Sequence, residues 1–133
     1  MTGRATLALF GAVAMLAGCG GGDDREQVEQ TVRDFVRATN ERDAEAFCED
    51  LVTQEFLEKS TGATGDSAKE SCREQFSRLK SLRFDLVRIT ETEVEDDTAR
   101  VRAVLRMQGQ VQDQVLRLEK EGGDWRLTGN PGG

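Results

Sequence analysis

The sequence contains no histidine, no tyrosine and a single proline among its 133 residues. Because histidine is absent, the chain cannot form a Ser-His-Asp triad, a histidine-ligated metal site or an imidazole acid–base pair. Basic residues are also fewer than acidic ones, 18 against 25, which gives a formal net charge of −7. Binding to nucleic acid needs a basic surface that neutralises phosphates, so this charge argues against a nucleic-acid partner. The length fits one small domain.

Long apolar runs are absent too, since no stretch reaches the roughly 18–20 residues of a membrane-spanning helix. A shorter apolar segment at the N-terminus follows a single positive charge, Arg4, and is rich in small residues, as signal peptides are. Its last letters, LAGC, end at Cys19 and resemble the bacterial lipoprotein box. The resemblance implies that residues 1–18 are removed and that the thiol of Cys19 carries a diacylglycerol. An ordinary secretory peptide with a chance cysteine near the cut is the alternative.

Lipid attachment would hold the protein at the cell membrane, on its extracytoplasmic face. Residues 19–25 contain three consecutive glycines followed by charged side chains, which predicts a flexible leash behind Cys19. The folded domain is then expected in residues 26–130. Its acidic charge gives no attraction to anionic lipid, so we assign the membrane contact to the lipid alone.

Two further cysteines, Cys48 and Cys72, each fall on an apolar helical face. The neighbours on these faces, at helical spacing, are Ala44, Phe47 and Leu51 for the first and Ala68, Phe76 and Leu79 for the second. Export into an oxidising compartment therefore predicts a disulfide between them, with two buried free thiols as the alternative. A redox-active pair is not expected because there is no Cys-x-x-Cys motif, and two thiols without histidine do not make a metal site.

The first half of the chain has helical periodicity and the second half has strand periodicity. Helices are expected over residues 26–39 and 44–51, then in a short turn carrying Phe56 and Leu57, and finally from a capping-box pattern at Ser67 to about residue 80. From residue 82 the period becomes two, with a phase switch after Leu86 that indicates a bulge. Strands are expected around residues 99–107, 111–120 and 125–128, joined by short turns. This order predicts an α+β fold, with three N-terminal helices packed on a four-stranded antiparallel sheet.

Three segments carry a resemblance to a known family: FVRATNERDAEAFCEDL, ESCREQF and the closing LRLEKEGGDWRLTG. Together with the exported N-terminus, they resemble small actinobacterial lipoproteins of the nuclear transport factor 2-like superfamily. The resemblance implies a cone-like fold in which a curved sheet wraps around helices and often leaves an apolar pocket. Pocket or core lining is expected from Phe35, Phe47, Phe76, Phe84, Leu105 and Trp125.

Enzymes of that superfamily place Asp, His, Tyr or Asn inside the cone, and no such residue can be transferred to this chain by position. Asp113 is expected on the solvent face of a strand rather than in the cone. The acidic run from Glu91 to Asp97 is expected on a solvated strand face and a hairpin tip, not in a calcium site. Arg100, Arg102 and Arg106 are expected to pair with acidic side chains on neighbouring strands, with an anion-binding stripe as the alternative. We therefore predict no catalytic residue, no metal and no cofactor.

The function expected from the sequence is a non-catalytic binding or interaction module at the cell envelope. Its partners would be the membrane through the lipid and a small apolar ligand or an envelope protein, and a homodimer is compatible with the superfamily. The alternative is a small enzyme of the ketosteroid isomerase or polyketide cyclase type, which acts on an apolar substrate with a buried carboxylate of raised pKa.

Overall fold

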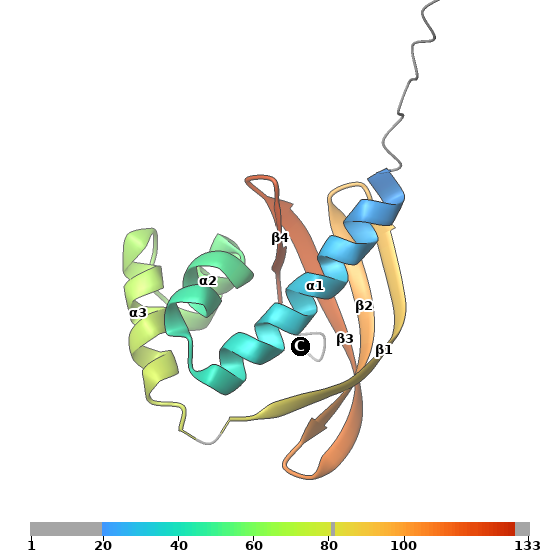
Figure 1. Ribbon diagram of the computed structural model, residues 1–133. Helices are drawn as coiled ribbons and strands as arrows, with labels where there is room; N and C mark the ends of the chain where they lie inside the picture. Colours follow the sequence, from blue (N-terminus) through green and yellow to red (C-terminus); the bar gives the residue numbers. More distant parts are fainter. Residues whose placement is uncertain (1–19, 81, 130–133) are drawn as a thin grey trace, which may run out of the picture.

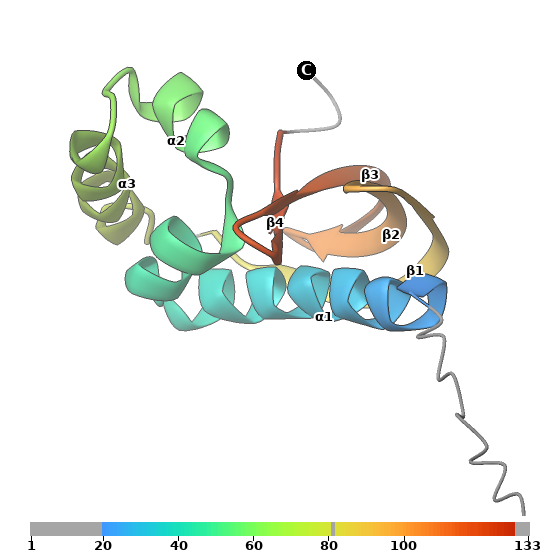
Figure 2. The ribbon, with the colours of Figure 1, turned by 90° about the horizontal axis from the view of Figure 1, so that it is seen from above.

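The structure is a computed structural model that describes residues 20–80 and 82–129. The predicted signal peptide and Cys19 lie outside the described residues. The elements are, in chain order, α1 (Gly20–Glu41), the π-helix η1 (Ala46–Leu51), α2 (Gln54–Thr61), α3 (Asp66–Ser77), β1 (Phe84–Glu95), β2 (Thr98–Met107), β3 (Gln110–Glu121) and β4 (Asp124–Leu127). The sheet curves around α1, and α2 and α3 lie together beyond one end of that helix (Figures 1 and 2). This α+β arrangement confirms the predicted fold class.

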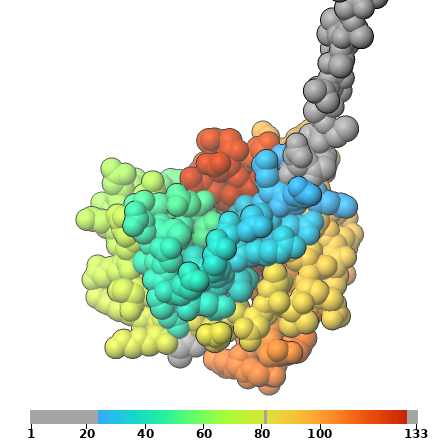
Figure 3. Space-filling model, in the orientation of Figure 1, coloured from blue at the N-terminus to red at the C-terminus, as the bar shows by residue number. Residues whose placement is uncertain are grey.

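Helix α1 presents an apolar stripe to the sheet. Val28, Val32 and Val36 recur at helical spacing and are buried, so this stripe forms one wall of the core. On the opposite side, charged side chains remain exposed to solvent. In the space-filling view, the blue to cyan side chains of α1 border the yellow side chains of β1 along much of the helix (Figure 3).

The helix begins earlier than the sequence predicts. It starts at Gly20 rather than at residue 26, so the expected flexible leash is helical from Gly20 onward. Contacts from distant parts of the chain explain the difference. Arg25 donates from Nη2 to the carbonyl of Thr92 at 2.7 Å, and the Asp24 carboxylate lies 3.1 Å from Lys120 Nζ. The indole of Trp125 also donates to Asp24, at 3.4 Å.

The short helices follow their local signals with one exception. The Thr53 hydroxyl accepts a hydrogen bond from the Phe56 N–H at 3.2 Å and caps α2, and Gly62 ends that helix in the left-handed conformation at φ 76°. The predicted capping box at Ser67 is wrong. Helix α3 begins at Asp66, its cap position is Gly65 and no side chain caps it there. It also ends at Ser77 rather than near residue 80.

The four strands form an antiparallel meander in the order β1-β2-β3-β4. Strand β2 alternates as predicted from Ala99 to Ala103, with Ala99, Val101, Ala103 and Leu105 buried on the concave face and Arg100, Arg102 and Arg106 on the outer face; Val104, in the arginine phase, is also buried. Strand β3 continues the same core with Leu116 and Leu118. The concave face is therefore mainly apolar, with the buried Thr92 of β1 as a polar exception.

Strand β1 is irregular at two points, one more than the sequence indicates. Its register against β2 shifts between Leu86 and Arg88 and again between Ile89 and Glu91. The first shift is the predicted bulge, and it leaves Val87 exposed while Ile89 packs on the core. Each bulge adds a residue to one strand only, which bends and twists it. Two bulges close together allow β1 to curve around α1.

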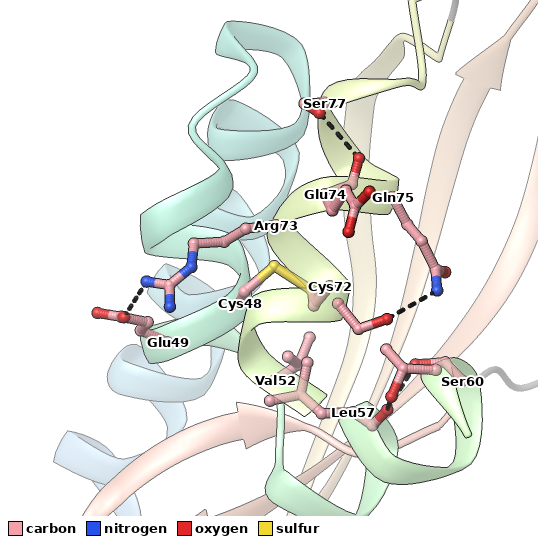
Figure 4. The surroundings of a disulfide bond; sticks show 12 residues. Cys48, Glu49, Val52, Leu57, Ser60, Cys72, Arg73, Glu74, Gln75 and Ser77 are labelled. Carbon is pink, nitrogen blue, oxygen red and sulfur yellow. Dashed lines mark hydrogen bonds and ion pairs between the residues drawn. A yellow bond between two sulfur atoms is a disulfide. The ribbon is translucent and has the colours of Figure 1, made fainter. Parts of the chain in front are cut away.

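The predicted disulfide between Cys48 and Cys72 is present and joins η1 to α3 (Figure 4). Both cysteines are buried, with exposed fractions of 0% and 8%. Beside them, Arg73 of α3 contacts the Glu49 carboxylate of η1 at 2.5 Å. None of the helices in the described part of the chain is long and apolar enough to span a membrane.

Candidate functional site

An apolar pocket lies inside the cone, between the C-terminal half of α1 and one end of the sheet. Its volume is about 260 Å³. Aromatic, aliphatic and thioether side chains make up nearly all of its lining, which consists of Phe35, Val52, Phe56, Phe84, Leu105, Met107, Gln114, Leu116, Leu127 and Gly129. Ligand pockets for drug-sized molecules begin at about 300 Å³, so this cavity suits a smaller molecule.

The fold brings these residues together from distant segments. Met107 pairs with both Phe84 of β1 and Gln110 of β3, so the starts of β1 and β3 meet the end of β2 at one edge of the cone. Helix α1 crosses this edge, and the side chain of Asn40 joins it to β1. The Asn40 amide accepts from the Phe84 N–H at 2.9 Å and donates to the Phe84 carbonyl at 2.5 Å.

Three of the six predicted lining residues, Phe35, Phe84 and Leu105, lie in the pocket. Two others, Phe47 and Phe76, continue an aromatic row away from it. Ring centroids are 6.4 Å apart for Phe84 and Phe35, 5.4 Å for Phe35 and Phe47, and 4.7 Å for Phe47 and Phe76. The row therefore connects the pocket wall to the core beside α3, where such aromatic pairs add to the stability of packing.

Trp125, the sixth predicted residue, belongs to the core and not to the pocket. It is 4% exposed, its indole N–H bonds Asp24, and the Lys120 ammonium lies 5.4 Å from the ring centroid. This cluster holds the N-terminal part of α1, next to the contact of Arg25 with Thr92 in the second half of β1. The pocket lies at the other end of the helix, since about 15 residues, or ~22 Å of helix, separate Gly20 from Phe35.

Sequence reasoning missed several lining residues, above all Gln114. Gln112 and Gln114 share the strand phase of Leu116 and Leu118, which placed them on the concave face and could have identified them. Val52 and Phe56 carried no comparable signal, because they reach the pocket through the path of the chain between η1 and α2.

The remaining candidate groups lie outside the pocket. Asp113 is exposed, as predicted, because its strand phase is that of the outer face. On that face the register sets Glu93 opposite Arg100 and Glu91 opposite Arg102, along a shallow hollow of about 220 Å³. The register also sets Asp85 opposite Arg106, so opposite charges face each other as predicted. The predicted ion pairs themselves are not formed, since none of the described ion pairs within 4.0 Å includes Arg100, Arg102 or Arg106.

Metal-binding and titratable groups are sparse near the pocket. Within residues 20–80 and 82–129, no three His, Cys, Asp or Glu side chains come together as a metal site requires. A second hollow borders the pocket and shares Phe56 and Gly129 with it. On this rim Lys59 contacts Glu55 at 2.7 Å, which raises the pKa of the lysine, so its charge is already paired.

Comparison with known proteins supports the fold. No protein-family model matches the chain, and no curated protein matches it. The structure is similar to that of a nuclear transport factor 2-like protein of unknown function from Silicibacter pomeroyi. Identity is 16%, the TM-score is 0.51, and the match covers 80% of this chain and 92% of the other.

The structure is also similar to that of a candidate scytalone dehydratase from Novosphingobium aromaticivorans. Identity is 18%, the TM-score is 0.50, and the match covers 79% of both chains. At these identities the likeness concerns the fold alone. Three helices packed on a curved four-stranded antiparallel sheet, together with these neighbours, show that the chain has a nuclear transport factor 2-like fold.

Proposed function

We propose that this protein is a lipid-anchored module on the extracytoplasmic face of the membrane, which binds a small apolar ligand in the cone pocket without transforming it. The observation that carries the proposal is the pocket lining. Nine of its ten residues have apolar side chains or none, and the tenth is the neutral amide Gln114. Burial of apolar surface in such a cavity stabilises a complex by about 25 cal/mol per Å².

The lining favours binding over acid–base chemistry. A general acid or base must lie within hydrogen-bond reach of the substrate, about 2.6–3.2 Å. An isomerase or cyclase of the type considered above would need a carboxylate in the pocket, and the described lining contains none. Asp113, the carboxylate considered for that role, is exposed on the outer face of the sheet.

The position of α1 supports a defined placement of the pocket relative to the anchor. If Cys19 carries the lipid, the helix begins at the next residue and is fastened to the sheet by Asp24 and Arg25. With no flexible segment between the lipid and the sheet, the orientation of the domain would be fixed relative to the start of α1. The pocket would then lie ~22 Å along the helix from the acylated residue, at the end of the cone away from it.

Ligand binding is tested by titrating the purified full chain with naphthalene and following the fluorescence of the probe. The wild type is expected to bind it, and Met107→Trp is expected to lose binding because the indole fills the pocket. Val111→Trp is the matched control, since Val111 is 57% exposed on the same hairpin. Equal binding by the two variants, or no binding by the wild type, would contradict the proposed pocket function.

Anchoring is tested on the protein recovered from its own cells. Intact mass spectrometry is expected to show a chain that begins at Cys19 and carries a diacylglycerol. Cys19→Ser is expected to leave residues 1–18 attached and the chain unacylated. A native chain that keeps Met1 and bears no lipid would refute the anchor, although pocket binding by the same chain would still stand.

A further inference from the structure

Gln114 is the one polar side chain in the described lining of the pocket, and its orientation is set by a neighbour. It projects from β3 on the concave face and is half-buried. Its Nε2 donates to Oε1 of Gln112, two residues earlier on the same face, at 3.2 Å. This bond engages one of the two N–H donors of the Gln114 amide, and the carbonyl oxygen, an acceptor with two lone pairs, has no donor among the described residues.

No other side chain in the described lining can supply that donor. The other nine residues contribute Phe, Val, Leu and Met side chains and one glycine. A ligand that fills the pocket would cover this oxygen. Covering it without a donor costs about 1–3 kcal/mol, whereas a donor on the ligand avoids the cost.

The charge of the ligand is restricted by the same lining. A carboxylate or ammonium group in this cavity would lose its hydration, and no oppositely charged side chain lines the pocket to compensate. Lys59, in the hollow that borders the pocket, already contacts Glu55. The pocket therefore favours a molecule without formal charge.

Resting on the proposed function of the pocket, we infer that it selects a neutral, mostly apolar molecule with one hydroxyl or N–H group, which donates a hydrogen bond to Oε1 of Gln114. Gln112 acts as a positioning residue because its carbonyl accepts a hydrogen bond from the Gln114 amide and so limits the rotation of that amide. The ligand class is thus a small apolar alcohol or phenol rather than a hydrocarbon, an ether or an acid.

Three probes with the same ring system separate the contributions of apolar burial, hydrogen-bond donation and hydrogen-bond acceptance to binding. They are naphthalene, 2-naphthol and 2-methoxynaphthalene. The last can accept a hydrogen bond but cannot donate one. With the purified full chain near neutral pH, 2-naphthol is expected to bind about fivefold more tightly than the other two, the equivalent of ~1 kcal/mol for one hydrogen bond. Gln114→Leu, which keeps the side-chain size, should reduce the preference to about one while naphthalene still binds. Gln110→Leu is the control, since Gln110 is exposed on the same strand.

The outcomes distinguish the two proposals. A preference for 2-naphthol that disappears in Gln114→Leu and persists in Gln110→Leu supports the inference. Equal binding of all three probes by the wild type, a preference that survives in Gln114→Leu, or a matching gain for 2-methoxynaphthalene overturns it and leaves the pocket function intact. Failure of every probe to bind the wild type overturns the pocket function and this inference together.

Discussion

Removal of the Cys48–Cys72 disulfide is expected to lower the free energy of unfolding by a large fraction of its total. The bond joins residues 24 apart in sequence. In the chain-entropy treatment, opening a loop of that length raises the conformational entropy of the unfolded chain. Its free energy is thereby lowered by about 3.5 kcal/mol at room temperature. Domains of this size are stable by about 5–15 kcal/mol in total, so the loss would remove roughly a quarter to two thirds of the stability.

Two perturbations separate the cross-link from the packing around it. Reduction of the wild type breaks the bond and leaves both sulfur atoms in the core. The double substitution Cys48→Ala and Cys72→Ala also removes the buried sulfurs, so it should cost more than reduction does. Cys19 is replaced by serine in every sample so that no third thiol can exchange.

Urea unfolding followed by the fluorescence of Trp125 is a suitable assay, because this is the single tryptophan and it is 4% exposed. For a urea dependence of about 1–3 kcal/mol per M, reduction should lower the midpoint by on the order of 2 M. The double alanine variant must not respond to the reductant. An unchanged midpoint on reduction of the wild type, with free thiols verified by labelling, would refute the reasoning.

The other predictions concern single side chains. Asn40→Ala should lower stability by about 1–3 kcal/mol in urea unfolding, because both backbone groups of Phe84 lose their partner; a loss near zero would count against that link. Leu118→Ala should cost about 2–5 kcal/mol and Val111→Ala much less, since the first side chain is 1% exposed and the second 57%; similar losses would contradict the described core. Hydrogen bonds from a loop N–H and a glutamine hold the pKa of Glu58 below its ordinary value of 4.5. The ionised group therefore stabilises the fold above that pH and the effect disappears as the pH falls, so melting temperatures of Glu58→Gln should decline less on acidification than those of the wild type.

Much of the architecture could be predicted because its signals are local. The spacing of Val28, Val32 and Val36 defines the buried face of α1, and the alternation from Ala99 to Leu105 defines β2. Both follow from the periods of the helix and the strand, which need no knowledge of the partner surface. The disulfide was predictable for the same reason, since each cysteine shares an apolar face with its helical neighbours.

The misjudged features depend on contacts between distant segments. The start of α1 is set by Thr92, Lys120 and Trp125, which lie far along the chain from Asp24 and Arg25. The second bulge of β1 likewise arises where the strand curves around the helix, and its only mark in the sequence is the change of phase between Ile89 and Val94. Local propensity cannot register such constraints, because they exist only once the sheet has formed.

The amino-acid sequence by itself determined the order of helices and strands and their buried faces, those of the two cysteines included, since each depends on neighbours a few residues away. The tertiary structure decided which of those faces enclose a cavity. Phe35 and Phe84 line it while Phe47 and Phe76 do not, although all four carry the same side chain and belong to one aromatic row. Whether a phenylalanine lines the cavity or packs in the core depends on its position between the curved sheet and the helices. That position is fixed only when the sheet has folded around α1.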